Sequence, residues 1–300
     1  MGAGAIGSLF GGYLAKLGED VTLIGRPLHV EAINEKGLKI DGVNGEHQIN
    51  VKAVDDIKYL DPANLDLILV TVKAYDVENA VNDIKPLISP KTNVLFLQNG
   101  LGIIDLILKI INQDQIIRGT TTNGALFIQP GYIRHTGQGD TFIGKLNSEK
   151  NDILNKIKSI FDRSGLPTKI TTSIKEILWR KLLINISINA FGALTGLPNG
   201  ELKKFFEDSM KQVIQEAIKI AKKMGIEIDI NTAINQTFNV LEKTAKNRNS
   251  MLQDVERKKK TEIDFINGII VKYGKIQGIP TPLNSLITSF IKGLEKSYLW

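Results

Sequence analysis

The sequence predicts an α/β domain built on a parallel sheet, followed by a second domain made only of helices. In the first half of the chain, short apolar runs rich in Val, Ile and Leu alternate with helical patterns. From about Ile170 onward the pattern is helical almost throughout, and segments containing Pro or Gly separate the helices. We place the boundary at the turn 165–167, which gives domains of 1–166 and 167–300.

Three apolar runs predict the strands of the first domain: Val21–Ile24, Leu65–Lys73 and Asn93–Leu97. Runs that are continuously apolar rather than alternating are typical of strands buried on both faces. A helical stretch at Val77–Ile88 separates two of them, which favours parallel pairing with right-handed crossovers. Gly and Pro turns within Gly124–Gly144 predict antiparallel strands that close this domain.

The second domain is predicted as a series of helices. We expect Thr172 or Ser173 to cap the first, with Glu176 in its first turn. The later helices are predicted over Gly200–Met224, Asn231–Ala245, Lys259–Tyr273 and Leu283–Lys296.

Composition excludes several classes of protein. The hydrophobic fraction of 42% and the charged fraction of 23% are ordinary for a soluble globular protein. The chain has no cysteine, which removes disulfides, thiolate nucleophiles and cysteine-based zinc sites. Its 3 histidines lack the spacing of metal ligands, so we expect no metal.

The net charge of +6 is modest, and its clearest cluster is Arg257–Lys260. We interpret this cluster as a solvated face at a helix start, since a nucleic-acid patch would carry interleaved aromatic residues. The longest apolar stretch, Leu182–Leu197, is short for a membrane span and is interrupted by Asn185, Ser187 and Asn189. Without a signal-peptide pattern, a cytoplasmic protein with no nucleic-acid or membrane partner is expected, and a homodimer stays open.

The chain begins with a glycine-rich motif, G-x-G-x-x-G, formed by Gly2, Ala3, Gly4, Ala5, Ile6 and Gly7. The first glycine permits a tight turn, the second lets the backbone approach a pyrophosphate, and the third lets a helix pack on a sheet. The helix that follows would direct its free N–H groups at the phosphates. We therefore predict a Rossmann-type dinucleotide-binding domain in which these six residues contact the cofactor.

Only Met1 precedes this motif, which normally follows a strand. The first strand is therefore expected to be truncated, through a misassigned start or a shortened chain. We expect the 300-residue form to be less stable, and to bind nucleotide less well, than an extended form.

The cofactor is predicted from the end of the second strand. An NAD enzyme usually places Asp or Glu there, but this chain has Gly25-Arg26. A guanidinium suits a 2′-phosphate, and Lys73, at the carboxyl end of a later strand, is a second candidate. We predict NADP, used as NADPH. The alternative is that Arg26 is a surface arginine in a turn.

Lys181, Asn185 and Asn189 recur every four residues in an otherwise apolar segment. In a helix this spacing places the three side chains on one face. The polar groups on such a face either line a functional site or form hydrogen bonds with solvent and a neighbouring helix.

The chain resembles the ketopantoate reductases (2-dehydropantoate 2-reductases) of pantothenate and coenzyme A biosynthesis over nearly its whole length. The matching motifs are GAGAIGS at 2–8, TVKAYD at 71–76, QNGLG at 98–102, WRKLLINISIN at 179–189, LPNGEL at 197–202, NSMLQDVERKKKTEIDFINGIIV at 249–271 and IPTPLN at 279–284. The resemblance implies a Rossmann-type domain, an all-helical domain and a substrate cleft between them. It implies NADPH-dependent reduction of ketopantoate to (R)-pantoate.

The resemblance also implies roles for single residues. Lys181 matches the general acid, and Glu262 contacts the reacting region. Asn99 lies near the nicotinamide and the substrate, and Arg26 and Lys73 match positions that favour the 2′-phosphate.

The substrate is assigned to four further residues by the same resemblance. Asn185 and Asn189 hold its polar groups, and Ser250 binds its carboxylate. Asn199 is a weaker substrate candidate.

Other interpretations stay open. The enzyme could reduce another keto acid, an imine or a sugar phosphate, or the protein could be an NADP-binding sensor without turnover. Asn99 could be only a turn residue, Glu262 an exposed residue in the first turn of a helix, and Ser250 an N-cap.

Overall fold

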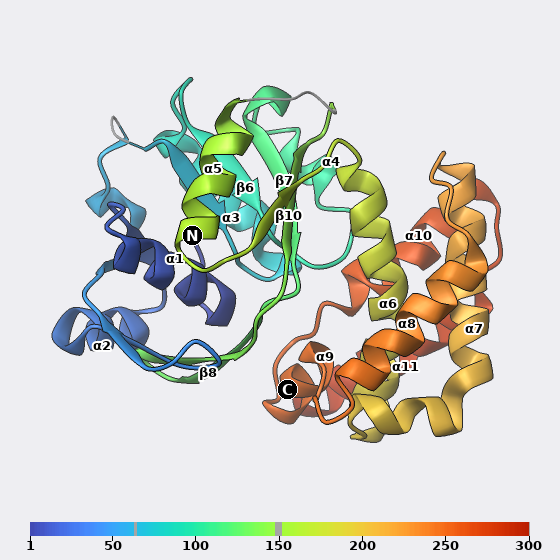
Figure 1. Ribbon diagram of the computed structural model, residues 1–300. Coiled ribbons are helices and arrows are strands. Elements are labelled where there is room, and N and C mark those ends of the chain that lie inside the picture. The colour runs from blue at the N-terminus through green and yellow to red at the C-terminus, as the bar shows by residue number, and fades with distance from the viewer. Residues whose placement is uncertain (63–64, 148–151, 300) are drawn as a thin grey trace. The chain divides into compact units, whose positions relative to one another are not determined.

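The computed structural model describes residues 1–62, 65–147 and 152–299. The chain divides into two compact units, each described by itself. Unit 1 consists of 1–98 and 103–174, and unit 2 consists of 99–102 and 175–300 (Figure 1). Unit 1 mixes strands and helices, whereas unit 2 is helical, so the predicted fold class is confirmed.

Two of the sheets of unit 1 contain the strands that flank the glycine motif. A five-stranded sheet has the order β11 (Thr168–Ile170), β10 (Thr141–Lys145), β7 (Ile116–Thr121), β6 (Asn93–Phe96) and β5 (Leu67–Val70). Strands β5, β6 and β7 pair in parallel, and β10 runs antiparallel to β7. The second of these sheets is the parallel pair of β1 (Thr22–Ile24) and β4 (Lys52–Val54).

The helices of unit 1 are α1 (Ala5–Leu17), α2 (Pro27–Lys36), α3 (Val77–Ile84), α4 (Ile104–Ile107) and α5 (Asp152–Arg163). Phe10 of α1 meets Phe161 of α5 edge to face, with ring centroids 5.4 Å apart. The buried core to which α1, α2 and α5 contribute also includes Leu95 of β6 and Ile117 of β7. Because apolar groups cover these strands, their sequences are continuously apolar.

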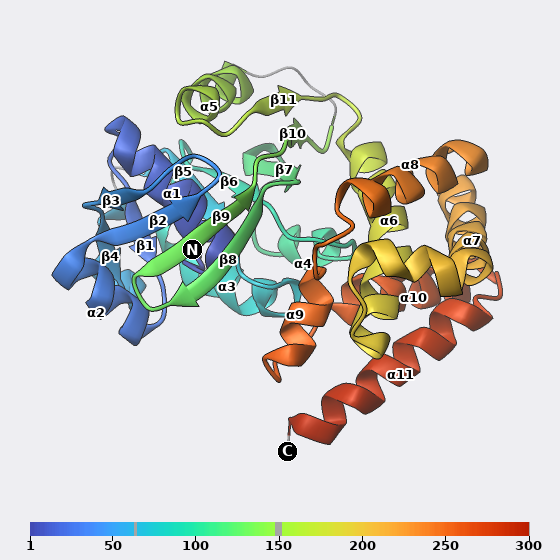
Figure 2. The same cartoon turned by 60° about the horizontal axis from the view of Figure 1, so that its bottom comes forward.

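A four-stranded sheet completes unit 1, in the order β3 (His47–Ile49), β2 (Leu38–Gly42), β9 (Tyr132–Gly137) and β8 (Gly124–Gln129) (Figure 2). Helix α1 packs closely on it, since a Cβ at Gly12 would lie 2.6 Å from Cδ1 of Ile40. The predicted antiparallel pairing of 124–144 is confirmed for β8 and β9. The hairpin of β2 and β3 was not predicted.

Residues Met1–Ala3 lie between the two parallel sheets and bond to both. The amino group of Met1 donates to Leu69 O at 2.8 Å, and the N–H of Thr71 donates to Met1 O at 2.9 Å. On the other side, the N–H of Ala3 donates to Ile24 O at 2.8 Å. These residues thus occupy the end of a strand position between β5 and β1, and in the described residues no strand precedes the glycine motif.

The helices of unit 2 are α6 (Ile174–Thr195), α7 (Asn199–Lys223), α8 (Ile230–Lys243), α9 (Ser250–Glu256), α10 (Asn267–Gln277) and α11 (Pro282–Tyr298). Helix α6 contributes many apolar side chains to the buried core of unit 2. The buried carboxylate of Glu216 on α7 accepts hydrogen bonds from the backbone N–H groups of Leu283 and Asn284, which fixes the start of α11.

Two predictions in this half were wrong. The helix expected over Lys259–Tyr273 begins only at Asn267, because Lys258 has a positive φ of 52° and a 3-10 turn covers Ile263–Phe265. The basic cluster 257–260 follows the end of α9 instead of starting a helix, although it is exposed as expected. Basic side chains at this end are favoured by the helix dipole.

By length and composition, α6 alone among the described helices resembles a membrane span. Its most apolar window is 67% buried inside the protein, as in the core helix of a soluble protein. Its hydrophobicity therefore reflects packing in unit 2.

The buried amino group of Met1 generates a prediction about pH. Burial lowers the pKa of this group from 8.0 to about 5. The unfolded chain therefore binds more protons than the folded one between about pH 5 and 8, and the free energy of unfolding falls as pH is lowered through this window. The slope approaches about 1.4 kcal/mol per pH unit.

An apolar extended segment fused upstream of Met1 converts the titratable amino group into an amide that does not titrate, and adds strand pairing. Urea unfolding at several pH values should show a more stable extended form whose stability lacks this dependence. Burial also lowers the pKa of His29 and His135, but their contribution to the pH dependence of stability is the same in both forms. Identical pH profiles for the two forms would contradict the prediction.

Candidate functional site

The glycine turn of unit 1 has a different steric requirement at each glycine. Gly2 has a φ of +92°, and a Cβ there would lie 2.7 Å from the backbone nitrogen of Val72. A Cβ at Gly7 would lie 2.3 Å from the oxygen of Gly2, so the first turn of α1 packs directly on the loop. A Cβ at Gly4 would meet nothing within 4 Å.

Gly4 therefore marks an open face at the N-terminus of α1. It is the N-cap residue, no side chain caps the helix there, and the first turn has no acidic residue. The first N–H groups of a helix lack intrahelical acceptors and attract anions. The open backbone and these donors fit a dinucleotide pyrophosphate.

Thr71 supports this turn from the end of β5. Its hydroxyl donates to Gly2 O at 2.8 Å and lies 3.2 Å from Met1 O. Sequence reasoning did not select Thr71. The available signal was its position directly after a buried strand, where side chains reach the carboxyl edge of the sheet.

The two basic residues expected to hold a 2′-phosphate both follow strands of unit 1. Arg26 follows β1 as the N-cap residue of α2, and its side chain is exposed. It has no ion pair with any residue in the described part of the chain. Lys73 follows β5 and is half-buried at the start of the 3-10 turn Ala74–Asp76. The residues that follow β1 in the sequence are Gly25, Arg26 and Pro27, and none of these three has a carboxylate.

The polar face predicted in the apolar segment lies on one uninterrupted helix, α6. Lys181 and Asn185 are half-buried, and Asn189 is only 5% exposed. Their spacing places them one above the other over two turns. Unit 2 thus carries an ammonium and two amides on the face of a core helix, where polar groups are costly unless they have partners.

Asn99 and Glu262 come together in unit 2, although they are far apart in sequence. Asn99 Nδ2 donates to Glu262 Oε2 at 3.4 Å. Glu262 is 4% exposed, so the alternative of an exposed residue in a helical turn is wrong. The loop 99–102, which contains Asn99, is held by a backbone hydrogen bond: the N–H of Leu101 donates to Phe265 O at 3.0 Å. Gly100 permits this close approach with a φ of +78°.

Gln98, the residue before this loop, is anchored in unit 1. Its Nε2 donates to Val70 O at 2.9 Å and to Val72 O at 3.2 Å. The side-chain amide thus continues the pairing of β6 with β5 past the end of the strand. Sequence reasoning did not assign this role.

Ser250 and Asn199 also belong to unit 2. Ser250 is the exposed first residue of α9, and its neighbour Asn249 is the cap, so the alternative that Ser250 is an N-cap is wrong. Asn199 starts α7 and is 6% exposed. Its Nδ2 donates to Thr244 Oγ1 at 2.9 Å, so this amide group already has a partner in the protein.

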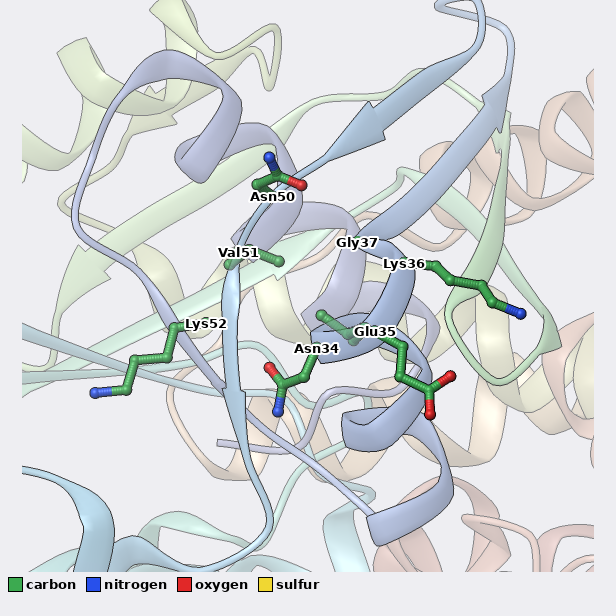
Figure 3. Close-up of a pocket in the computed structure, with 8 residues that line it drawn as sticks. Asn34, Glu35, Lys36, Gly37, Asn50, Val51 and Lys52 are labelled. Carbon is green, nitrogen blue, oxygen red and sulfur yellow. The ribbon is translucent and has the colours of Figure 1, made fainter.

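A shallow hollow on unit 1 contains none of the predicted site residues. It lies where α2 ends and β4 begins (Figure 3). The charged side chains of Glu35, Lys36 and Lys52 point away from one another there (Figure 3). Diverging charges do not form a ligand site.

Comparison with known proteins relates both units to one family. Residues 1–148 match the model of the ketopantoate reductase PanE/ApbA family, and residues 173–295 match the model of its C-terminal domain. The chain belongs to the ketopantoate reductase PanE/ApbA family. The resemblance inferred from the sequence motifs is thereby confirmed.

Members of this family align with nearly the whole chain. A 2-dehydropantoate 2-reductase of Pyrococcus horikoshii is 42% identical over 297 residues, covering 98% of this chain and 96% of the relative. A solved ketopantoate reductase of Ralstonia eutropha has a TM-score of 0.91 at 32% identity, covering 100% of this chain and 98% of that one. A structure of D-mandelate dehydrogenase with NADH and anilino(oxo)acetate has a TM-score of 0.93 at 30% identity, covering 99% and 97%.

A matched pair of glycine substitutions tests the turn. Gly4→Ala should weaken dinucleotide binding about tenfold, or about 1.4 kcal/mol, because the new methyl group enters the open face. It should leave the thermal midpoint nearly unchanged. Gly7→Ala should instead destabilise the protein by about 1–3 kcal/mol, because its methyl group overlaps the backbone of Gly2.

Titration with NADPH and thermal unfolding of both variants measure these effects. Unchanged affinity in a folded Gly4→Ala protein would argue against the turn as the pyrophosphate site.

Proposed function

We propose that the protein reduces ketopantoate to (R)-pantoate with NADPH, in pantothenate and coenzyme A biosynthesis. The observation that carries this proposal is the full-length match to 2-dehydropantoate 2-reductases, at 42% identity to the Pyrococcus horikoshii protein. The site residues of both units support it. NADPH, when bound, supplies the hydride.

Lys181 is the proposed proton donor. Reduction of a ketone places negative charge on its oxygen, and an ammonium beside that oxygen stabilises the charge and donates the proton. Glu262 is proposed to act in the same region. Its contact with Asn99 supports this, since the carboxylate holds the amide that we assign to the nicotinamide and substrate.

The substrate is proposed to bind through Asn185, Asn189 and Ser250, with Asn199 as a weaker candidate. An amide can donate to and accept from a neutral hydroxyl, which suits the asparagines of α6 to the alcohol group of ketopantoate. The exposed hydroxyl of Ser250 suits the carboxylate. The bond to Thr244 occupies Nδ2 of Asn199, so only its buried Oδ1 is left to accept a hydrogen bond from a substrate.

The cofactor is proposed to bind through the glycine turn 2–7, with Arg26 and Lys73 on the 2′-phosphate and with Asn99 and Glu262 near the nicotinamide. The open face at Gly4 and the exposed guanidinium of Arg26 support this assignment. Guanidinium and ammonium groups both bind phosphate, and Arg does so with two parallel hydrogen bonds.

A second candidate function follows from the D-mandelate dehydrogenase structures, which contain NADH and match at 30% identity. The protein would then reduce an aryl 2-keto acid with NADH. Steady-state kinetics with ketopantoate and phenylglyoxylate, each with NADPH and NADH, separates the two. Tight NADPH binding without oxidation by any keto acid would instead indicate a sensor.

We also propose a cytoplasmic enzyme without nucleic-acid or membrane partners, and a homodimer stays open. The burial of α6 within unit 2 supports the absence of a membrane partner. Sedimentation of the purified protein tests the dimer.

Replacing Lys181 tests the proton donor. Lys181→Ala should lower kcat about 10²–10⁴-fold, because it removes both the charge and the proton. Lys181→Arg is the matched control, since it keeps the charge but cannot donate a proton near neutral pH. It should recover only part of the loss. A kcat near that of the wild type in Lys181→Ala, with saturating keto acid, would exclude Lys181 as the acid.

Replacing Arg26 tests the choice of cofactor. Arg26→Ala should raise the KM for NADPH about 10–100-fold, because a hydrogen-bonded charge contributes about 1.5–3 kcal/mol. The KM for NADH should change little. Equal effects on both cofactors would place Arg26 away from the 2′-phosphate.

A further inference from the structure

The side chain of Asn249 links two helices of unit 2. Its Oδ1 accepts from the N–H of Leu252 at 3.0 Å, which caps α9. Its Nδ2 donates to the carbonyl oxygen of Ile188, in the middle of α6, at 3.3 Å. The residue is 9% exposed, so both bonds are shielded from water.

Gly192 provides the space for this link. It lies one turn after Ile188 on α6, and a Cβ there would be 2.2 Å from Asn249 Nδ2. Glycine inside a helix is about 1 kcal/mol less favourable than alanine, so it needs a packing reason. The close approach of Asn249 is that reason.

The two linked positions are each adjacent to a residue of the proposed substrate site. Ile188 precedes Asn189 on α6, and Asn249 precedes Ser250 on α9. The hydrogen bond therefore ties the chain next to Ser250 to the chain next to Asn189. A short helix of 7 residues has little stability of its own, so its position depends on such contacts.

The other flank of α6 is held in a similar way. Asn267, at the start of α10, donates through Nδ2 to Ile186 O at 3.1 Å and to Asn284 Oδ1 at 3.0 Å. Because α6 is fixed on this side, loss of the Asn249 bond would move α9 and leave α6 in place.

We propose that Asn249 and Gly192 form a positioning pair that sets Ser250 against the polar face of α6, and so controls how tightly the keto acid binds. This rests on the proposed function. A displacement of the order of 1 Å is enough to reduce productive binding strongly. The pair acts on the keto acid and leaves the nucleotide site of unit 1 untouched.

Two variants of Asn249 separate its hydrogen bond to Ile188 O from its capping of α9. Asn249→Ser keeps a capping oxygen but is too short to reach Ile188, whereas Asn249→Ala removes both bonds. We expect the KM for ketopantoate to rise about tenfold in both, which corresponds to about 1.4 kcal/mol. The thermal midpoint should fall clearly only in Asn249→Ala. The KM for NADPH should stay constant.

Asp229→Ala is the matched control for the loss of a cap. Asp229 caps α8 by accepting from the N–H of Thr232 at 2.7 Å, and this bond is exposed. The variant should lose thermal stability without a change in the KM for ketopantoate. A KM that rises equally in Asp229→Ala would show that destabilisation alone accounts for the effect, and would overturn the proposal.

A double-mutant cycle tests whether Gly192 acts through Asn249. Gly192→Ala should raise the KM for ketopantoate in the wild-type background, because its methyl group displaces Asn249. In the Asn249→Ser background it should add little, because the displaced amide is gone. Additive effects, or an unchanged KM in Asn249→Ser, would overturn the proposal.

The same measurements distinguish this proposal from the proposed function. A wild-type protein that does not oxidise NADPH with ketopantoate contradicts the function. A wild-type protein that does so, with Asn249 variants whose KM for ketopantoate is unchanged, contradicts only the positioning pair.

Discussion

The burial of α6 is the constraint on which unit 2 depends. This helix supplies apolar side chains such as Trp179 and Ile186 to the core, and it also carries Lys181, Asn185 and Asn189. Polar groups in such a place require fixed partners, because an unpaired polar group loses its hydration on burial. Neighbouring segments also bond to the backbone of α6, through the side chains of Asn249 and Asn267. The same contacts that hold the fold of unit 2 thus also hold the helix that carries the proposed site residues.

Unit 1 is organised around close backbone approach. Only hydrogen atoms fit at Gly2 and Gly7, where α1 begins against the loop that follows β5. Thr71 then bonds to the loop from the strand end, so the turn is held from two sides. Such a preformed turn reduces the ordering that a ligand must bring about when it binds. The open face at Gly4 remains the place where a ligand can approach the helix terminus.

Much of this arrangement could be predicted from the sequence, because the relevant signals are local. The glycine spacing, the apolar runs of β5 and β6, and the four-residue spacing on α6 each depend on short-range geometry. The features that were missed depend on contacts between distant residues. The helix α9 is too short to show a period, and the start of α10 is set by backbone conformation at Lys258. The bond between Asn249 and Ile188 joins positions 61 apart in sequence, and neither residue type reveals it.

The path of the chain between the units has a consequence for dissecting the protein. The chain leaves unit 1 after Gln98, returns at Ile103 and leaves again after Ile174. A fragment ending at residue 174 would retain the loop 99–102 but lose Phe265, the acceptor for its backbone. The complementary fragment, starting at 175, would lack that loop and leave Glu262 without Asn99. A single cut after residue 174 therefore separates the loop 99–102 from the unit in which it packs.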